Sequence, residues 1–285
     1  MIQLINEFTV LLAEGTKALA ATRCATPQLD AGFLLADLLG IERAAMLLDP
    51  PAMLPPGTAE IYRRRIARRV AGEPVHYITG KKEFYDHTFQ VGPAVLIPRP
   101  ETEEMVETVL KQFPSGAELY VADVGTGSGC IAISLGLERP VWHVTAVDLS
   151  GDALDIARIN AARLGAANMS FVQSDLFTAV PGLFDIIVSN PPYIDFGVKD
   201  TLQVEVRKFE PPLALFAAER GLAVIRELVA QSAEHLKSGG FFFCEIGYDQ
   251  KEAVRKFFDD GMWDDITFLK DISGHDRIVR AVRRP

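Results

Sequence analysis

The sequence contains few cysteines and no clustered metal ligands. Its three cysteines, Cys24, Cys130 and Cys244, lack the spacing of a metal site and cannot form an even disulfide framework. No segment reaches the roughly 18 uninterrupted apolar residues of a membrane-spanning helix, and residues 1–10 lack the basic start of a secretion signal. We therefore expect a cytoplasmic protein in a reducing compartment, with no membrane contact and no bound metal.

Positive charge is also scarce. The chain has 29 Lys and Arg residues against 38 Asp and Glu residues, which gives a net charge of −9. Because affinity for a phosphate backbone comes from Lys and Arg displacing counterions, this balance argues against a nucleic-acid partner. The main basic cluster consists of the arginines between residues 63 and 69. It is either a solvated helix face or a docking surface, and the sequence leaves both interpretations open.

The hydrophobic pattern predicts three regions. A hydrophobic content of 48% is enough for a sizeable core. Apolar residues recur at helical spacing through residues 1–73, which predicts a small helical domain. Residues 74–97 carry short alternating segments with aromatic residues, which are typical of a β-hairpin linker. Helical and strand signals then alternate through residues 98–285, which indicates an α/β domain with a mainly parallel, twisted, Rossmann-like sheet.

Individual elements of the α/β domain are predicted as well. Ser150 is expected to cap a helix that ends at Gly165, because its hydroxyl can accept an amide hydrogen bond and glycine tolerates the left-handed conformation. Further helices are expected at residues 101–113, 130–137 and 220–237. Strands are expected at residues 119–124, 144–148, 169–173, 185–189, 240–246 and 278–282.

A glycine-rich segment, residues 123–129, lies between a predicted strand and a predicted helix. Its glycines allow a sharp turn and close approach to a ligand. A dinucleotide fingerprint would need a third glycine at position 130, where Cys130 stands. The G-x-G-x-G spacing instead resembles motif I of S-adenosylmethionine methyltransferases, although a purely structural turn remains an alternative. The resemblance implies that the cofactor contacts Gly125, Thr126, Gly127, Ser128 and Gly129.

Two further strand ends carry candidate cofactor-binding residues. Asp148 ends the next strand, where a carboxylate can accept hydrogen bonds from both ribose hydroxyls. The methyltransferase resemblance places Asp175 near the adenine amino group and Leu176 against the adenine ring, although Asp175 is also a candidate helix cap. Leu176 offers apolar contact but not the aromatic stacking of some relatives.

The tetrad Asn190-Pro191-Pro192-Tyr193 follows the fourth strand. A planar amide or amino nitrogen is a poor nucleophile because its lone pair is delocalised, so acceptors must hold its hydrogens and orient the pair. The Asn190 side-chain oxygen and the Pro191 carbonyl are suited to this, and Tyr193 is expected to stack on the substrate. We expect Asn190, Pro191 and Tyr193 to be catalytic, all four residues to bind substrate, and Asn190 to border the cofactor. Neither a metal nor a covalent nucleophile is required, and the product would be S-adenosylhomocysteine.

If the first and fourth strands are neighbours, the glycine-rich segment and the tetrad face one crevice. The tetrad itself suits adenine, cytosine and glutamine substrates alike, so the substrate must be inferred from other segments. They resemble the HemK/PrmC family, the release factor glutamine methyltransferases, over nearly the whole chain. These segments are residues 72–74, 77–80, 83–84, 96–103, 206–211 and 274–277.

The resemblance implies that the substrate is the glutamine of the Gly-Gly-Gln loop of class I peptide chain release factors. It also implies that residues 1–73 help to hold the factor. Two alternatives stay open. A DNA adenine or cytosine amino methyltransferase would need a basic target-recognition domain, which is not evident after the tetrad. A module that binds the cofactor without chemistry would not need the tetrad.

Overall fold

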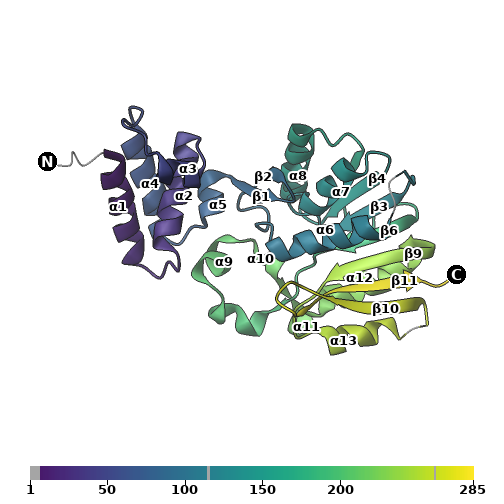
Figure 1. The fold of residues 1–285 in the computed structure, drawn as a ribbon. Helices are drawn as coiled ribbons and strands as arrows, with labels where there is room; N and C mark the ends of the chain where they lie inside the picture. The colour runs from purple at the N-terminus through teal and green to yellow at the C-terminus, as the bar shows by residue number, and fades with distance from the viewer. Residues whose placement is uncertain (1–6, 114–115, 260) are drawn as a thin grey trace. The chain divides into compact units, whose positions relative to one another are not determined.

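The computed structural model describes residues 7–113, 116–259 and 261–285 (Figure 1). The chain forms two compact units. The first comprises residues up to Gly80 together with residues 203–209, and the second comprises residues 81–202 and 210–285. The first unit therefore extends past the boundary expected near Glu73 and takes in a distant segment of the sequence.

The first unit is helical, as predicted. Its helices are α1 (Glu7–Ala20), α2 (Pro27–Leu39), α3 (Arg43–Leu48), α4 (Thr58–Val70), α5 (Val75–Thr79) and α9 (Val204–Phe209). Leu11, Leu34 and Tyr62 are fully buried in its core. Residues 75–79 form helix α5 and not the start of a hairpin, because Gly80 ends the helix in a left-handed conformation before the first strand begins.

The arginines of α4 pair with acidic residues of the same unit. The pairs are Arg63–Glu14, Arg64–Glu60, Arg65–Asp37, Arg68–Glu73 and Arg69 with both Asp30 and Glu205. Arg69 and Asp30 are both buried. A cation held by carboxylates in its own unit is largely neutralised, so the structure supports the helix-face interpretation of this cluster and not a basic docking surface.

The second unit begins with a hairpin and contains a seven-stranded sheet. Strands β1 (Lys81–Phe84) and β2 (His87–Gln90) pair antiparallel. The sheet has the order β10-β11-β9-β6-β3-β4-β5. Its strands are β3 (Tyr120–Val124), β4 (His143–Asp148), β5 (Met169–Gln173), β6 (Phe184–Ser189), β9 (Leu236–Glu245), β10 (Trp263–Lys270) and β11 (Asp276–Arg283). Strands β3, β4, β5, β6, β9 and β10 run in one direction and β11, which pairs antiparallel with both β9 and β10, runs in the other, so the predicted mainly parallel Rossmann-like sheet is confirmed.

Helices cover both faces of this sheet. They include α6 (Pro100–Gln112), α7 (Cys130–Glu138), α8 (Gly151–Leu164), α12 (Ala223–His235) and α13 (Lys251–Arg255). Successive strand residues point to opposite faces, and accordingly Val121 packs in the core cluster that contains α6 and α7, whereas Ala122 packs in the cluster that contains α12. The remaining elements are β7 (Ile194–Asp195), η1 (Phe196–Thr201), α10 (Pro212–Leu215), β8 (Phe216–Ala217), α11 (Ala218–Gly221) and η2 (Lys256–Phe258).

The predicted capping residues are confirmed, one predicted helix start is wrong, and one strand was missed. The Ser150 hydroxyl accepts a hydrogen bond from the Ala153 amide, and Gly165 is left-handed after α8. The helix expected from residue 220 begins at Ala223, because Glu219 and Arg220 adopt positive φ angles that interrupt it. Strand β10 was not predicted, since its exposed charged residues hide the alternation.

Candidate active site

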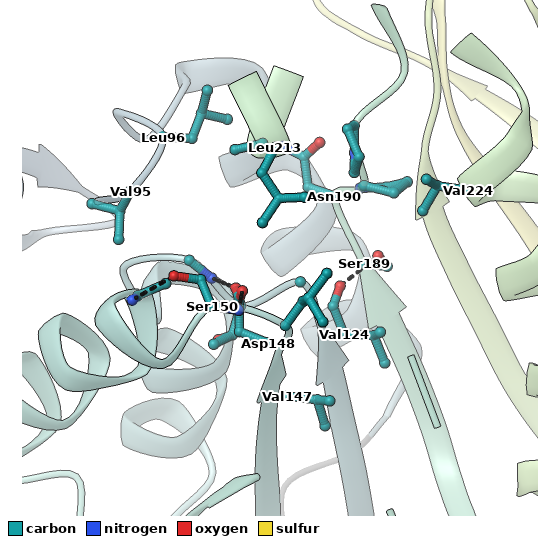
Figure 2. A pocket seen from close by; sticks show the side chains of 18 of the residues that line it. Val95, Leu96, Val124, Val147, Asp148, Ser150, Ser189, Asn190, Leu213 and Val224 are labelled. Carbon is teal, nitrogen blue, oxygen red and sulfur yellow. Dashed lines mark hydrogen bonds between the residues drawn. The ribbon is translucent and has the colours of Figure 1, made fainter. Parts of the chain in front are cut away.

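A pocket of about 340 Å³ opens at the carboxyl ends of the parallel strands (Figure 2). Strands β3 and β6 are neighbours, and the chain leaves this pair in opposite directions, toward β4 and β5 on one side and toward β9 on the other. Ligands of open α/β sheets bind where the strand order reverses in this way. Residues of the glycine-rich loop after β3 and of the tetrad after β6 line one pocket, as expected if the first and fourth strands are neighbours.

The glycines of the loop after β3 have different surroundings. Gly125 and Gly127 line the pocket with φ angles of 77° and 55°. A Cβ atom at Gly127 would meet no atom within 4 Å, so it would occupy space open to a ligand. Gly129 does not line the pocket, and a Cβ atom there would lie 2.7 Å from Ile133 Cδ1. Two glycines thus keep the pocket open, whereas the third permits close packing of α7.

Asp123, at the end of β3, forms hydrogen bonds with this loop and with the start of α7. Its Oδ2 atom accepts hydrogen bonds from Thr126 Oγ1 at 2.7 Å and from the Ala132 amide at 3.1 Å. The side chain is fully buried, and among the described residues its Oδ1 atom has no hydrogen-bond partner. Burial raises the pKa of Asp123 to about 7, against the hydrogen bonds that lower it. The loop is therefore hydrogen-bonded to a carboxyl group whose ionisation is unfavourable in the folded protein.

Asp148 lies at the end of β4 and connects the two neighbouring loops. Its Oδ2 atom accepts from the Gly127 amide and its Oδ1 atom accepts from the Ser150 amide, each at 2.8 Å (Figure 2). Burial raises its pKa, and these backbone donors oppose that rise. Each carboxylate oxygen has further acceptor capacity. Asp148 can therefore hold the loop and still accept hydrogen bonds from ribose hydroxyls.

Asp175 and Leu176 line the pocket beyond β5. Asp175 is exposed, and the residues after it form a turn, so it does not cap a helix there. Leu176 adopts a φ angle of 46° and packs partly against the α12 core cluster. Leu213 and Val224 add apolar surface to the same pocket (Figure 2). An apolar wall, a carboxylate and open glycine backbone together suit an adenosine with a charged tail.

The tetrad is held by a chain of hydrogen bonds that leads from the pocket wall into the protein. Asn190 Nδ2 donates to Thr102 Oγ1 at 3.0 Å, and Thr102 Oγ1 donates to Glu245 Oε2 at 2.7 Å. The Tyr193 hydroxyl donates to Glu245 Oε1 at 2.9 Å. Glu245 is only 2% exposed, so it joins both ends of the tetrad from inside the protein. Asn190, Pro191 and Pro192 line the pocket.

Tyr193 differs from its expected placement. It is absent from the residues that line the pocket, and its ring packs partly against the α12 core cluster. Burial raises its pKa well above the usual range, and Glu245 raises it further. A ring fixed at its hydroxyl by a buried carboxylate anchors the loop, so stacking on the substrate is not the role that this geometry favours.

The backbone of the tetrad is held as firmly as its side chains. Gln250 Nε2 donates to the Tyr193 carbonyl at 2.9 Å. Gly221 has a φ angle of 84°, and a Cβ atom there would overlap the same carbonyl. Neither residue was singled out from the sequence, nor was Glu245, and Thr102 appeared only within a family segment. A buried acid at the end of β9 was the one available signal, because the carboxyl ends of such strands border the ligand site.

Comparison with known proteins identifies the family. Residues 10–80 match the PrmC N-terminal domain, and residues 102–258 match the methyltransferase small domain. A release factor glutamine methyltransferase of Koribacter versatilis is 46% identical, covering 92% of this chain and 94% of the relative. One of Leptospira interrogans is 38% identical, covering 98% and 99%. The chain belongs to the release factor glutamine methyltransferase family.

Solved structures support the fold independently. A methyltransferase from Pyrococcus furiosus aligns with a TM-score of 0.51 at 19% identity, covering 78% of this chain and 97% of that one. A ribosomal protein L11 methylase from Lactobacillus delbrueckii subsp. bulgaricus aligns with a TM-score of 0.50 at 21% identity, covering 66% and 81%. At such identities the likeness shows a methyltransferase fold and no more.

Between residues 7 and 285, leaving aside 114–115 and 260, no group of three or more His, Cys, Asp or Glu side chains is placed to hold a metal ion. Over the same ranges no helix combines the length and apolar character needed to cross a membrane.

Proposed function

We propose that this chain transfers a methyl group from S-adenosylmethionine to the side-chain amide nitrogen of the glutamine in the Gly-Gly-Gln motif of class I peptide chain release factors. The observation that carries the proposal is the orientation of Asn190. Its Nδ2 atom is engaged by Thr102, which leaves Oδ1 as an acceptor in the pocket that the glycine-rich loop also lines. The names of relatives that match nearly the whole chain support the substrate.

The cofactor would lie along the ends of β3, β4 and β5. Residues 125–129 offer open backbone, with Gly129 acting through the packing of α7. Asp148 would accept hydrogen bonds from the ribose, while Asp175 and Leu176 would border the adenine. Bound S-adenosylmethionine supplies a methyl group on a sulfonium that is already a good leaving group. The protein's task is therefore alignment of nitrogen, methyl carbon and sulfur.

The tetrad would prepare the glutamine nitrogen. Asn190 Oδ1 and the Pro191 carbonyl would each accept one N–H of the amide, which turns the nitrogen lone pair toward the methyl group. These acceptors also favour the positive charge that the nitrogen gains in the transition state. Pro191 and Pro192 restrict the backbone and lack N–H groups, so the loop presents its acceptors rigidly. The products are the N-methyl amide, S-adenosylhomocysteine and a proton.

The first unit would bind the release factor rather than take part in the chemistry. Every residue assigned to the cofactor or to the amide lies in the second unit. The free cysteines, Cys24, Cys130 and Cys244, suit the cytoplasm, where such a substrate would be met.

A methyl-transfer assay tests the proposal. The full chain is incubated with radiolabelled cofactor and, separately, with a class I release factor, the same factor with its Gly-Gly-Gln glutamine changed to alanine, and duplex DNA. Label is expected in the unaltered factor alone. Equal labelling of the altered factor would refute the assigned nitrogen, and labelling of DNA would favour the amino methyltransferase alternative.

A further inference from the structure

The orientation of the Asn190 amide has a cause inside the protein. We propose that Thr102 and Glu245 are positioning residues that set which end of the Asn190 side chain faces the substrate. The inference rests on the proposed function and deepens it, because it concerns residues that act on the substrate amide through Asn190. Its basis is the direction of hydrogen bonding along the chain from Glu245 through Thr102 to Asn190.

An asparagine amide has two nearly isosteric ends, one a donor and the other an acceptor. With Oδ1 toward the pocket, Asn190 accepts an N–H of the substrate glutamine. With Nδ2 toward the pocket, it presents hydrogens to the hydrogens of the glutamine, so the lone pair of the substrate nitrogen is no longer held toward the methyl group. Methyl transfer therefore requires an interaction that favours the orientation with Oδ1 toward the pocket.

Glu245 sets the direction of the hydrogen bonds along this chain. The Thr102 hydroxyl directs its single hydrogen to Glu245 Oε2, while the Tyr193 hydroxyl donates to Oε1, so both carboxyl oxygens act as acceptors. The remaining lone pairs of Thr102 Oγ1 then only accept, and the neighbouring end of Asn190 must be its donor, Nδ2. The opposite end, Oδ1, is thereby turned away from Thr102. One buried carboxyl group thus sets the orientation of a side chain that it does not touch.

Both carboxyl oxygens of Glu245 accept hydrogen bonds, Oε2 from Thr102 and Oε1 from Tyr193. Burial raises the pKa of Glu245, while hydrogen bonds from Thr102 and Tyr193 and the positive charge of Arg277 lower it. Arg277 is held beside it, since it donates to the Ile246 carbonyl and to Asp271 Oδ2. Thr102 is itself buried, with 2% of its surface exposed. A rotated Asn190 would set its carbonyl oxygen against the lone pairs of Thr102.

Thr102→Val and Thr102→Ser form a matched pair for the test. Valine keeps the size of threonine and removes the hydroxyl, whereas serine keeps the hydroxyl. In single-turnover methylation of the release factor, Thr102→Val should be slower by about tenfold to a hundredfold and Thr102→Ser should stay within about threefold of the parent. The loss should appear in kcat, with KM for the factor and the calorimetric affinity for S-adenosylmethionine nearly unchanged.

A double-mutant cycle separates positioning from a general structural role. If Thr102 acts through Asn190, Thr102→Val should add almost nothing to the loss already caused by Asn190→Ala. Thr102→Ala removes the hydroxyl without placing a methyl group against the carboxylate, and it gives the same comparison if the valine variant does not fold. Equal rates for the valine and serine variants, or fully additive losses, would overturn the inference. Failure of the parent chain to label the factor would instead refute the proposed function.

Discussion

The backbone amide of Gly127 donates a hydrogen bond to Asp148 Oδ2 over 2.8 Å, which joins the loop after β3 to the end of β4. The carboxylate assigned to the ribose therefore also shapes the glycine-rich loop assigned to the rest of the cofactor. Because Ser150 donates to the other oxygen, Asp148 is fixed on both sides. A pocket whose acceptor is oriented before binding loses little freedom when the ligand arrives.

Asp148→Ala should weaken the binding of S-adenosylmethionine by about tenfold to a hundredfold. A hydrogen bond to a charged group contributes roughly 1.5 to 3 kcal/mol, and the loosened Gly127 loop adds to the loss. Calorimetric titration measures the affinity. Asp155→Ala is a matched control, because that carboxylate lies on the adjacent helix α8 and pairs with Arg158 at the surface. Unchanged affinity in a folded Asp148→Ala protein would remove this residue from the ribose-binding role.

Asn190→Ala should reduce turnover by about 10²-fold to 10³-fold, or roughly 2.7 to 4 kcal/mol, because it removes one preorganised acceptor for the substrate amide. Cofactor affinity should change much less. Asn190→Asp keeps an acceptor but adds negative charge near the sulfonium, so it should bind the cofactor at least as well while remaining slow. Single-turnover rates at saturating substrate decide the matter, and parental rates for Asn190→Ala would make the tetrad purely structural.

Gly221→Ala should destabilise the protein by more than Gly239→Ala. Both glycines have positive φ angles, of 84° and 76°, so both variants incur the cost of a left-handed alanine, about 1 kcal/mol. Only at Gly221 would the added Cβ overlap the Tyr193 carbonyl, whereas nothing lies within 4 Å of the corresponding point at Gly239. The extra loss should be about 1 to 3 kcal/mol in chemical denaturation. Equal losses would show that the tetrad backbone yields readily.

Asp123→Asn should gain stability relative to the parent as pH rises. The pKa of Asp123 is raised from 3.8 to about 7 in the folded protein, so between these values the folded state binds more protons than the unfolded state. The stability of the parent therefore falls as pH rises through this window and levels off above it. A pKa difference of one between the two states corresponds to about 1.36 kcal/mol, so the fall in stability has an upper limit of roughly 4 kcal/mol.

The difference in unfolding free energy between Asp123→Asn and the parent should be measured by denaturant titration at several pH values. Taking the difference cancels the titration of all other groups that the two proteins share. It should increase from pH 4 to about pH 7 and stay constant at higher pH. A difference independent of pH would mean that Asp123 ionises normally in the folded protein.

Local signals in the sequence sufficed for much of the fold. The strand at 169–173 was predicted with the bounds that the structure has, because an apolar run between turn residues is a local property. Ser150 and Gly165 marked the ends of α8 for the same reason, since a cap depends on backbone groups a few residues away. The glycine-rich loop and the tetrad were visible because their chemistry depends on consecutive residues.

Contacts between distant residues were decided only by the tertiary structure. Thr102 and Glu245 are 143 positions apart, and no periodicity links a helix residue to a strand end at that separation. The rotamer of Asn190, the inward anchoring of Tyr193 and the overlap point at Gly221 all follow from such contacts. The sequence by itself determined which acceptors the site contains. Packing determined where they point, because a buried carboxylate fixes the direction of every hydrogen bond that reaches it.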